Sequence, residues 1–293
     1  EEEWSSLITS LNTYKEKIRL LESSFSGITE NFNFFLKKSL QHSESSIILK
    51  DDLKISSDEI IAIENFINLS LKKIPFEYIL KEAEFYGRNF YVDPRVLIPR
   101  NETELLIEIL IENNVEEEPK IIDLGTGSGC IGISIALEIP KSKVIGLDSS
   151  IDAIEVATIN KDLLKASNFN LVKSDWLSEI NENNFDVIIS NPPYIDLSDP
   201  HLEHLKHEPQ SALIASDNGL SDFKKISSQA YPLLKGGGIL MFEHGYNQSD
   251  EVTEIMKLNK FNKIKTYKDY QLHPRITIGI KWACLYNLYQ SIF

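Results

Sequence analysis

The chain is poor in cysteine, carries fewer bases than acids, and lacks any long uncharged apolar run. Its two cysteines, Cys130 and Cys284, form neither a close pair nor a metal-ligand spacing. This excludes a disulfide scaffold and indicates a reducing compartment. No apolar stretch reaches the roughly 20 residues that a membrane-spanning helix needs, and the three glutamates at the start have the wrong charge for a secretory signal. We therefore expect a cytoplasmic protein that does not associate with membranes.

Basic residues are too few for a typical nucleic-acid-binding protein. There are 30 Lys and Arg against 44 Asp and Glu, which gives a formal charge of -14. Proteins that bind phosphate backbones are usually basic on at least one face, so we expect no direct binding to DNA. The overall charge does not exclude a local basic patch. The apolar content of 42% is that of a globular protein. We expect the protein to act as a monomer.

Residues 1–74 have the pattern of a small helical bundle. Ser56 followed by Glu59 matches a capping box at the start of a helix. Near the beginning of the chain, apolar residues recur at helical spacing, namely Leu7, Leu11, Tyr14, Ile18 and Leu21. This pattern fits either a plain structural bundle or a module that docks a partner.

The rest of the chain changes character twice. Residues 75–103 are rich in aromatics with interspersed glycine and proline, which predicts short strands or a β-hairpin linker. From residue 104 to 282, strand-like and helix-like segments alternate, which is typical of a doubly wound α/β sheet. The last two strand-like segments, "FNKIKTY" and "RITIGIKW", lack a clear helix between them and could pair antiparallel at one edge. Residues 283–293 form an apolar tail for which we have no account.

A glycine-rich loop follows the first of these strands. "DLGTGSG" joins an apolar strand to a helical run, and its glycines let a ligand approach the backbone closely. Asp148 ends the next strand, where a carboxylate can bind the ribose hydroxyls of an adenosine. The glycines follow the pattern G-x-G-x-G and not the G-x-G-x-x-G that binds a pyrophosphate. This pattern suits a cofactor in which adenosine is linked to an amino acid and no pyrophosphate is present. The alternative is a tight turn that binds no ligand. The predicted contacts are Gly125, Thr126, Gly127, Ser128, Gly129 and Asp148.

"SDW" ends the third strand-like segment. Asp175 could accept a hydrogen bond from the adenine amino group, and Trp176 could form one wall of the adenine pocket. Core packing is an equally good explanation for the tryptophan.

A rigid segment, Asn191-Pro192-Pro193-Tyr194, follows the fourth strand. A residue before proline is held extended, and neither proline has an N–H group to pair. The Asn191 side-chain oxygen and the Pro192 carbonyl can therefore bind the two N–H groups of a planar NH2 group, while Tyr194 packs over it. Such positioning suits methyl transfer to a weakly nucleophilic nitrogen. We predict Asn191, Pro192 and Tyr194 as catalytic, all four residues as substrate-binding, and Asn191 also as a cofactor contact.

The chain resembles the release factor glutamine methyltransferases over nearly all of residues 75–282. The resemblance rests on the segments "EFYGRNFYVDPRVLIPRNETE", "DLGTGSGCIGISIA", "KSDWLS", "SNPPYIDLSDPHL", "HEPQSALIASDNGL" and "FEHGYNQ". It implies a Rossmann-like, seven-stranded α/β methyltransferase domain at 104–282, a linker at 75–103, and a helical substrate-docking domain at 1–74.

The resemblance also implies an activity. S-adenosylmethionine would be the methyl donor, with S-adenosylhomocysteine as product and no metal. The acceptor would be the glutamine of the Gly-Gly-Gln motif in class I peptide chain release factors. Arg100, Glu102 and Thr103 would support the mouth of the active site. Asn101 replaces a proline of the family pattern and the segment 269–275 lacks the usual glycines, which we expect to alter loops and leave activity intact.

Other readings compete with this one. A related class methylates a glutamine of a large-subunit ribosomal protein, and an adenine-amino DNA methyltransferase or a non-catalytic cofactor-binding protein would share some motifs. A dehydrogenase is disfavoured because Asn-Pro-Pro-Tyr serves no hydride transfer. His201, His204 and His207 have a spacing that could suggest a metal site, but the polar, proline-bounded stretch indicates solvated histidines. The run Lys235–Gly238 lacks the spacing of a phosphate loop and is interpreted as a helix stop.

Overall fold

The computed structural model describes residues 10–49, 53–113 and 116–283. The chain divides into two compact units, residues 1–82 and 83–293, which are described separately. The predicted tail lies outside the described residues except for Ala283, and so does Leu7. No helix in the described ranges is long and apolar enough to cross a membrane.

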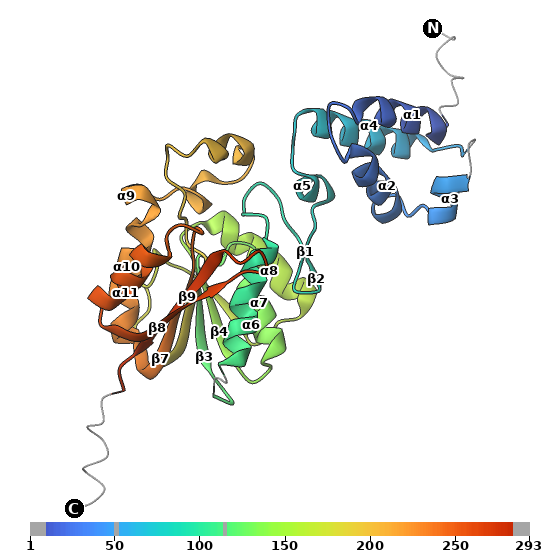
Figure 1. Ribbon diagram of the computed structural model, residues 1–293. Helices are drawn as coiled ribbons and strands as arrows, with labels where there is room; N and C mark the ends of the chain where they lie inside the picture. The colour runs from blue at the N-terminus through green and yellow to red at the C-terminus, as the bar shows by residue number, and fades with distance from the viewer. Residues whose placement is uncertain (1–9, 50–52, 114–115, 284–293) are drawn as a thin grey trace, which may run out of the picture. The chain divides into compact units, whose positions relative to one another are not determined.

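The first unit is a bundle of helices around one apolar core (Figure 1). Its helices are α1 (Leu11–Leu21), α2 (Ile28–Lys38), α3 (Glu44–Leu49), α4 (Ser57–Leu71) and α5 (Phe76–Leu80). The predicted capping box is confirmed, because Ser56 Oγ accepts from the Glu59 N–H and Glu59 Oε2 accepts from the Ser56 N–H. The rings of Phe35 and Phe66 stack at 4.9 Å in the core, so aromatic packing joins α2 to α4.

A short hairpin opens the second unit. Strands β1 (Ala83–Phe85) and β2 (Arg88–Phe90) pair antiparallel. The two turn residues, Tyr86 and Gly87, have φ of 50° and 68°, as a two-residue hairpin turn of this hand requires. The expected linker range 75–103 thus contains α5 of the first unit, this hairpin, and the 3-10 turn η1 (Asn101–Thr103).

A seven-stranded sheet forms the centre of the second unit (Figure 1). Its order is β5-β4-β3-β6-β7-β9-β8, and only the pairs that involve β9 are antiparallel. The predicted α/β fold and the antiparallel pairing of the last two strands are therefore confirmed. The strands are β3 (Lys120–Leu124), β4 (Lys143–Asp148), β5 (Phe169–Lys173), β6 (Phe185–Ser190), β7 (Leu234–Glu243), β8 (Phe261–Lys268) and β9 (Pro274–Lys281).

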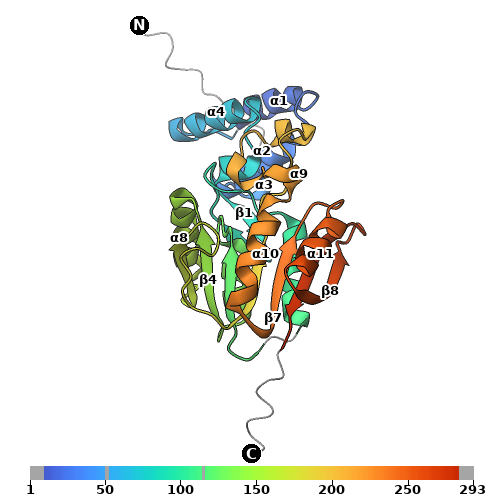
Figure 2. The ribbon, with the colours of Figure 1, turned by 90° about the vertical axis from the view of Figure 1, so that its left-hand side faces the viewer.

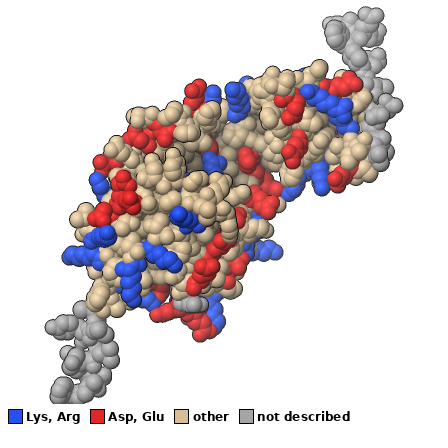
Figure 3. Space-filling model, viewed as in Figure 1, with Lys and Arg blue, Asp and Glu red and all other residues tan. Residues whose placement is uncertain are grey.

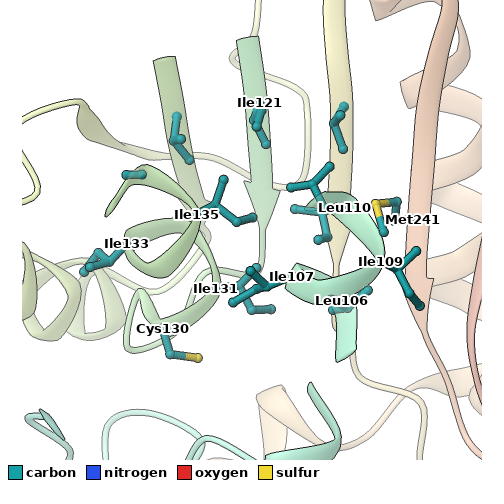
Figure 4. Close-up of a cluster of buried hydrophobic side chains, with 14 of the residues drawn as sticks. Leu106, Ile107, Ile109, Leu110, Ile121, Cys130, Ile131, Ile133, Ile135 and Met241 are labelled. Carbon is teal, nitrogen blue, oxygen red and sulfur yellow. The ribbon is translucent and has the colours of Figure 1, made fainter. Parts of the chain in front are cut away.

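Helices cover both faces of the sheet, and Figure 2 looks onto the face that α10 and α11 cover. Because side chains alternate along a strand, Ile121 of β3 faces one core and Ile122 faces the other. Figure 4 shows the first core, in which side chains of α6 and α7 meet those of the strands; α10 and α11 pack on the second. The helices are α6 (Glu104–Glu112), α7 (Cys130–Glu138), α8 (Ile151–Leu164), α9 (Ser216–Gly219), α10 (Ser221–Leu233) and α11 (Ser249–Leu258), with 3-10 turns η2 (Pro200–Leu205) and η3 (Gln210–Ala212).

The glycine run Lys235–Gly238 is not the helix stop that we expected. Helix α10 ends before it, and the run lies inside β7. There the register against β6 slips, because Phe185 pairs with Leu234 whereas Val187 pairs with Ile239. The glycines accommodate the extra residues of this bulge.

Candidate active site

A cavity of about 270 Å³ lies where the carboxyl ends of β3, β4 and β6 meet. Its position matches the crevice at which open α/β sheets bind ligands. It brings together residues that the sequence placed on four separate segments. Its lining includes Gly125, Gly127, Asp148, Asp175, Trp176 and Asn191.

The glycine loop is held in shape from behind. Asp123 is fully buried, and its Oδ2 accepts from Thr126 Oγ1 at 2.6 Å and from the Gly132 N–H at 2.9 Å. Burial raises the pKa of Asp123 to about 6. Of the five predicted loop contacts, Gly125 and Gly127 line the cavity. Thr126, Ser128 and Gly129 are buried and do not line it, so they support the loop.

Asp148 connects the loop to the next helix. Its two carboxylate oxygens accept from the Gly127 N–H at 3.0 Å and from the Ser150 N–H at 2.9 Å. Burial raises the pKa of Asp148, and these backbone hydrogen bonds oppose the shift. Each oxygen keeps a lone pair, so the carboxylate can still accept hydrogen bonds from a ligand in the cavity.

The Trp176 ring lies beside Gly125 of the loop. A Cβ placed on Gly125 would lie 3.6 Å from the Trp176 ring, so the indole closes one side of the cavity. Trp176 has a φ of 52°, an uncommon backbone conformation that clusters at functional sites. Asp222 of α10 also lines the cavity, and a hydrogen bond with Trp176 opposes the burial that raises its pKa. Asp175 is more exposed and pairs with Lys225 at 2.7 Å.

Asn191 follows β6 directly and faces two cavities. Its Nδ2 donates to Thr103 Oγ1 at 3.2 Å, which turns Oδ1 away from Thr103. Among the described residues, none donates a hydrogen bond to the Pro192 carbonyl. Burial raises the pKa of the Tyr194 phenol, whose hydroxyl lies 3.5 Å from the buried Glu243.

The second cavity, of about 130 Å³, adjoins the rigid segment. Its lining includes Asn191, Pro192, Tyr194, Leu97, Arg100 and Ala212. The buried Glu208 holds Arg100 of this lining in place, because its carboxylate pairs with Arg100 at 2.5 Å and accepts from the Ile98 N–H at 3.0 Å. Pro193 lines the larger cavity instead. Asn191 therefore stands at the junction of the two spaces.

The loop 269–273 contains no glycine, and one carboxylate holds its backbone in place. Asp269 accepts hydrogen bonds from the Gln271 and His273 N–H groups and from Arg275 Nε. Leu272 adopts a φ of 66°, which glycine would reach without strain. Asn101 begins η1, so both departures from the family pattern lie in ordered backbone.

The three spaced histidines do not gather around a common point. His201 pairs with Asp199 at 2.7 Å on the exposed turn η2. Within residues 10–49, 53–113 and 116–283, no group of three or more His, Cys, Asp or Glu could hold a metal ion. On the face visible in Figure 3, lysine and arginine are interspersed with aspartate and glutamate.

Comparison with known proteins decides the family. Residues 116–290 match a model described as a methyltransferase domain. A release factor glutamine methyltransferase of Aliivibrio fischeri is 38% identical over 236 residues, which cover 78% of this chain and 82% of the relative. The enzymes of that name from Coxiella burnetii (36%, 78% and 83%) and Vibrio cholerae (40%, 70% and 73%) are similar to the same extent. The chain belongs to the release factor glutamine methyltransferase family.

Solved structures agree with the fold. A methyltransferase from Pyrococcus furiosus superposes with a TM-score of 0.53 at 18% identity, covering 78% of this chain and all of that one. A 16S rRNA N2 G1207 methyltransferase of T. thermophilus, solved with AdoMet and guanosine, gives 0.52 at 18% identity over 68% and 49%. The seven-stranded methyltransferase fold of this family member is thus shown.

Three acids at the site escaped the sequence-based prediction. Asp222, Glu208 and Glu243 lie outside the glycine loop, "SDW" and the Asn191–Tyr194 segment, and they reach the site only through folding. Glu208 and Glu243 lie in "HEPQ" and "FEHG", two segments that contributed to the resemblance. The only local signal that could have identified them was an acid before a proline or at the end of a strand. Their roles depend on burial, which the sequence does not display.

Proposed function

We propose that this protein transfers a methyl group from S-adenosylmethionine to the side-chain amide nitrogen of a glutamine. The acceptor is the glutamine of the Gly-Gly-Gln motif in class I peptide chain release factors, as the relatives' names and the motif resemblance suggest. The observation that carries the proposal is that two cavities meet at Asn191. One is large enough for part of a cofactor, and the other fits a single side chain.

The larger cavity fits an adenosine-bearing cofactor. Gly125 and Gly127 leave the wall without side chains, and the Asp148 carboxylate has acceptor capacity for ribose hydroxyls. Trp176 offers a flat apolar wall. Asp222, which is partly buried beside it, is a better placed acceptor for the adenine amino group than the exposed, paired Asp175. When bound, S-adenosylmethionine supplies an electrophilic methyl group on a sulfonium.

The smaller cavity fits a carboxamide. Asn191 Oδ1 and the Pro192 carbonyl accept the two N–H groups of the substrate amide, while Tyr194 packs against its plane. Both acceptors raise the electron density on nitrogen and direct its lone pair toward the cofactor side. The nitrogen would release one proton to solvent after it has gained the methyl group, with S-adenosylhomocysteine as the leaving group, so the site needs no strong base before the transfer.

We assign the remaining parts of the chain by the same proposal. Residues 1–74 dock the release factor, residues 75–103 link the two parts, and residues 104–282 carry the chemistry. The protein works as a monomer in the cytoplasm, in keeping with its two cysteines and its charge of -14.

The deciding experiment is radiolabelled methyl transfer from S-adenosylmethionine. A release factor, the large-subunit ribosomal protein and duplex DNA are offered in parallel. We expect label in the release factor alone, and none when its Gly-Gly-Gln glutamine is replaced. Label only in the ribosomal protein or the DNA would contradict the proposed substrate.

The variant Asn191→Ala tests the assigned site. We expect it to fold and to retain some cofactor binding, because Asp148 and Trp176 are unchanged although one contact is lost. Methyl transfer should fall by about 100-fold or more, since positioned groups at a reacting centre contribute factors of this size. Undiminished turnover in Asn191→Ala would refute the role of its carboxamide.

A further inference from the structure

Three polar side chains from distant segments form one chain of contacts beside the two cavities. Asn191 Nδ2 donates to Thr103 Oγ1 at 3.2 Å. The Glu243 carboxyl interacts with the Thr103 hydroxyl, and this interaction opposes the burial that raises the pKa of Glu243. Thr103 is 3% exposed and Glu243 is 2% exposed. The three residues come from the carboxyl ends of β6 and β7 and from the turn before α6.

The direction of these hydrogen bonds follows from the groups involved. A threonine hydroxyl has one proton, and an ionised carboxylate can only accept. A buried carboxylate is a stronger acceptor than an amide oxygen, so the Thr103 proton goes to Glu243. The Thr103 lone pairs then face Asn191, which must present its NH2 group; a reversed amide would place two acceptors against each other.

We propose that Thr103 and Glu243 are positioning residues that fix which end of the Asn191 carboxamide faces the substrate. The inference rests on the proposed function. With Nδ2 held by Thr103, Oδ1 faces the cavities and can accept an N–H of the substrate amide. A reversed Asn191 would present its own NH2 group to the NH2 group of the substrate, and the site would lose one of its two acceptors.

The ionisation of Glu243 gives this arrangement a pH dependence. Burial raises the pKa of Glu243 to about 7. The charged or titratable groups that face it are Arg275 from β9, Tyr194 after β6, Glu102 beside Thr103, and Cys130 at the start of α7. Once Glu243 takes a proton, the Thr103 hydroxyl is free to donate to Asn191 instead, and the amide is no longer fixed.

The test compares Thr103→Val, Thr103→Ser and the control Thr277→Val. Thr277 is equally buried, but its hydroxyl contacts His244 and Thr266. For Thr103→Val at pH 8 we expect kcat with a release factor to fall about 10-fold or more, with KM and the calorimetric Kd for S-adenosylmethionine unchanged. Thr103→Ser should restore kcat, and Thr277→Val should keep it.

The pH profile separates positioning from a merely structural effect. Wild-type kcat should fall as the pH drops below about 7, and Thr103→Val should lack this limb because its side chain cannot transmit the protonation of Glu243. If Thr103→Val fails to fold, Glu243→Gln is used as the test variant. The new amide of this variant can donate to Thr103, so we expect the same loss of kcat and no fall of kcat below pH 7.

Two results would overturn the inference alone. One is wild-type kcat in Thr103→Val, and the other is a raised KM at unchanged kcat, which would indicate a role in binding. A wild-type protein that methylates no release factor would instead overturn the proposed function, and this inference with it.

Discussion

Asp148 shows how one side chain can serve both the fold and the site. Its carboxylate accepts N–H groups from the glycine loop and from the start of α8, and the same carboxylate lines the larger cavity. The two backbone contacts hold it in one orientation. A ligand that enters the cavity therefore meets an acceptor that needs no rearrangement.

Asp148→Asn should weaken cofactor binding. An amide has only one acceptor oxygen, so the variant leaves either the Gly127 or the Ser150 N–H opposite an NH2 group and offers less to the ribose. Because hydrogen bonds to charged groups contribute about 1.5–3 kcal/mol, we expect Kd to rise about 10-fold to 150-fold by calorimetry. Asp152→Asn is the control, since it removes an exposed charge nearby. Equal Kd values in the two variants would contradict the assignment.

At the scale of elements, the ends of helices determine local stability. Helix α4 begins with a complete capping box, in which Ser56 and Glu59 satisfy each other's backbone N–H groups. Helix α10 follows a tight turn at Gly219, whose backbone runs directly against the Tyr194 carbonyl. The first feature belongs to the bundle, and the second links α10 to the substrate segment.

Ser56→Ala should destabilise the helical unit. Loss of an N-cap hydroxyl costs about 1 kcal/mol, and the Glu59 contact alone cannot replace it. The expected result is faster hydrogen exchange of the α4 amides. Ser57→Ala, which changes an exposed serine at the next position, serves as control. Matching exchange rates in the two variants would show that the cap contributes nothing.

Gly219→Ala should disturb the site through the backbone. A Cβ at this position would lie 2.1 Å from the Tyr194 carbonyl oxygen, and the residue has a φ of 80°. Gly237→Ala is the matched control, because its φ is 86° and its Cβ would meet nothing within 4 Å. In the control, alanine must adopt a left-handed backbone conformation, and we expect this strain alone to lower the free energy of unfolding by about 1–2 kcal/mol.

For Gly219→Ala we expect a larger loss of stability and a clear fall in methyl transfer, because Tyr194 must move. The measurements are urea unfolding and the radiolabel assay. If Gly219→Ala and Gly237→Ala lose the same stability and keep the same activity, the close contact is not limiting.

At the scale of the whole molecule, the methyltransferase unit buries acids near its site. Burial raises the pKa of Glu243 to about 7 and that of Asp123 to about 6. The folded state therefore holds protons that the unfolded chain has already released. Stability should fall as the pH rises from about 4.5 to 7 and level off above, because the unfolded state binds fewer protons in this window.

Glu243→Gln should flatten this fall. The variant cannot ionise, so relative to wild type it should gain up to about 3 kcal/mol between pH 4.5 and 7, at 1.36 kcal/mol per unit of pKa shift. Urea unfolding at several pH values, followed by tryptophan fluorescence to which Trp176 and Trp282 of the second unit contribute, measures this. Glu179→Gln changes an exposed residue, so its free energy of unfolding should depend on pH as that of the wild type does. The same pH dependence in Glu243→Gln would contradict the view that Glu243 ionises at the expense of stability.

The sequence by itself determined the order of elements and the motif segments. Hydrophobic periodicity predicted the alternating strands and helices, because each side chain's burial repeats with the geometry of its element. The capping box, the glycine loop and the antiparallel last strands were also readable, since each depends on residues close in the chain. Lys235–Gly238 was misread because a bulge depends on the partner strand, which local sequence does not contain.

Only the tertiary structure decided which of those residues face the site. Spacing does not give the direction of a side chain, so Thr126 and Ser128 were grouped with Gly125 although they turn inward. Thr103 reaches Asn191, and Glu243 lies beside Thr103, because folding brings η1 to the carboxyl ends of β6 and β7. Burial then sets the charge of Glu243, and through it the orientation of an amide that the sequence had already supplied.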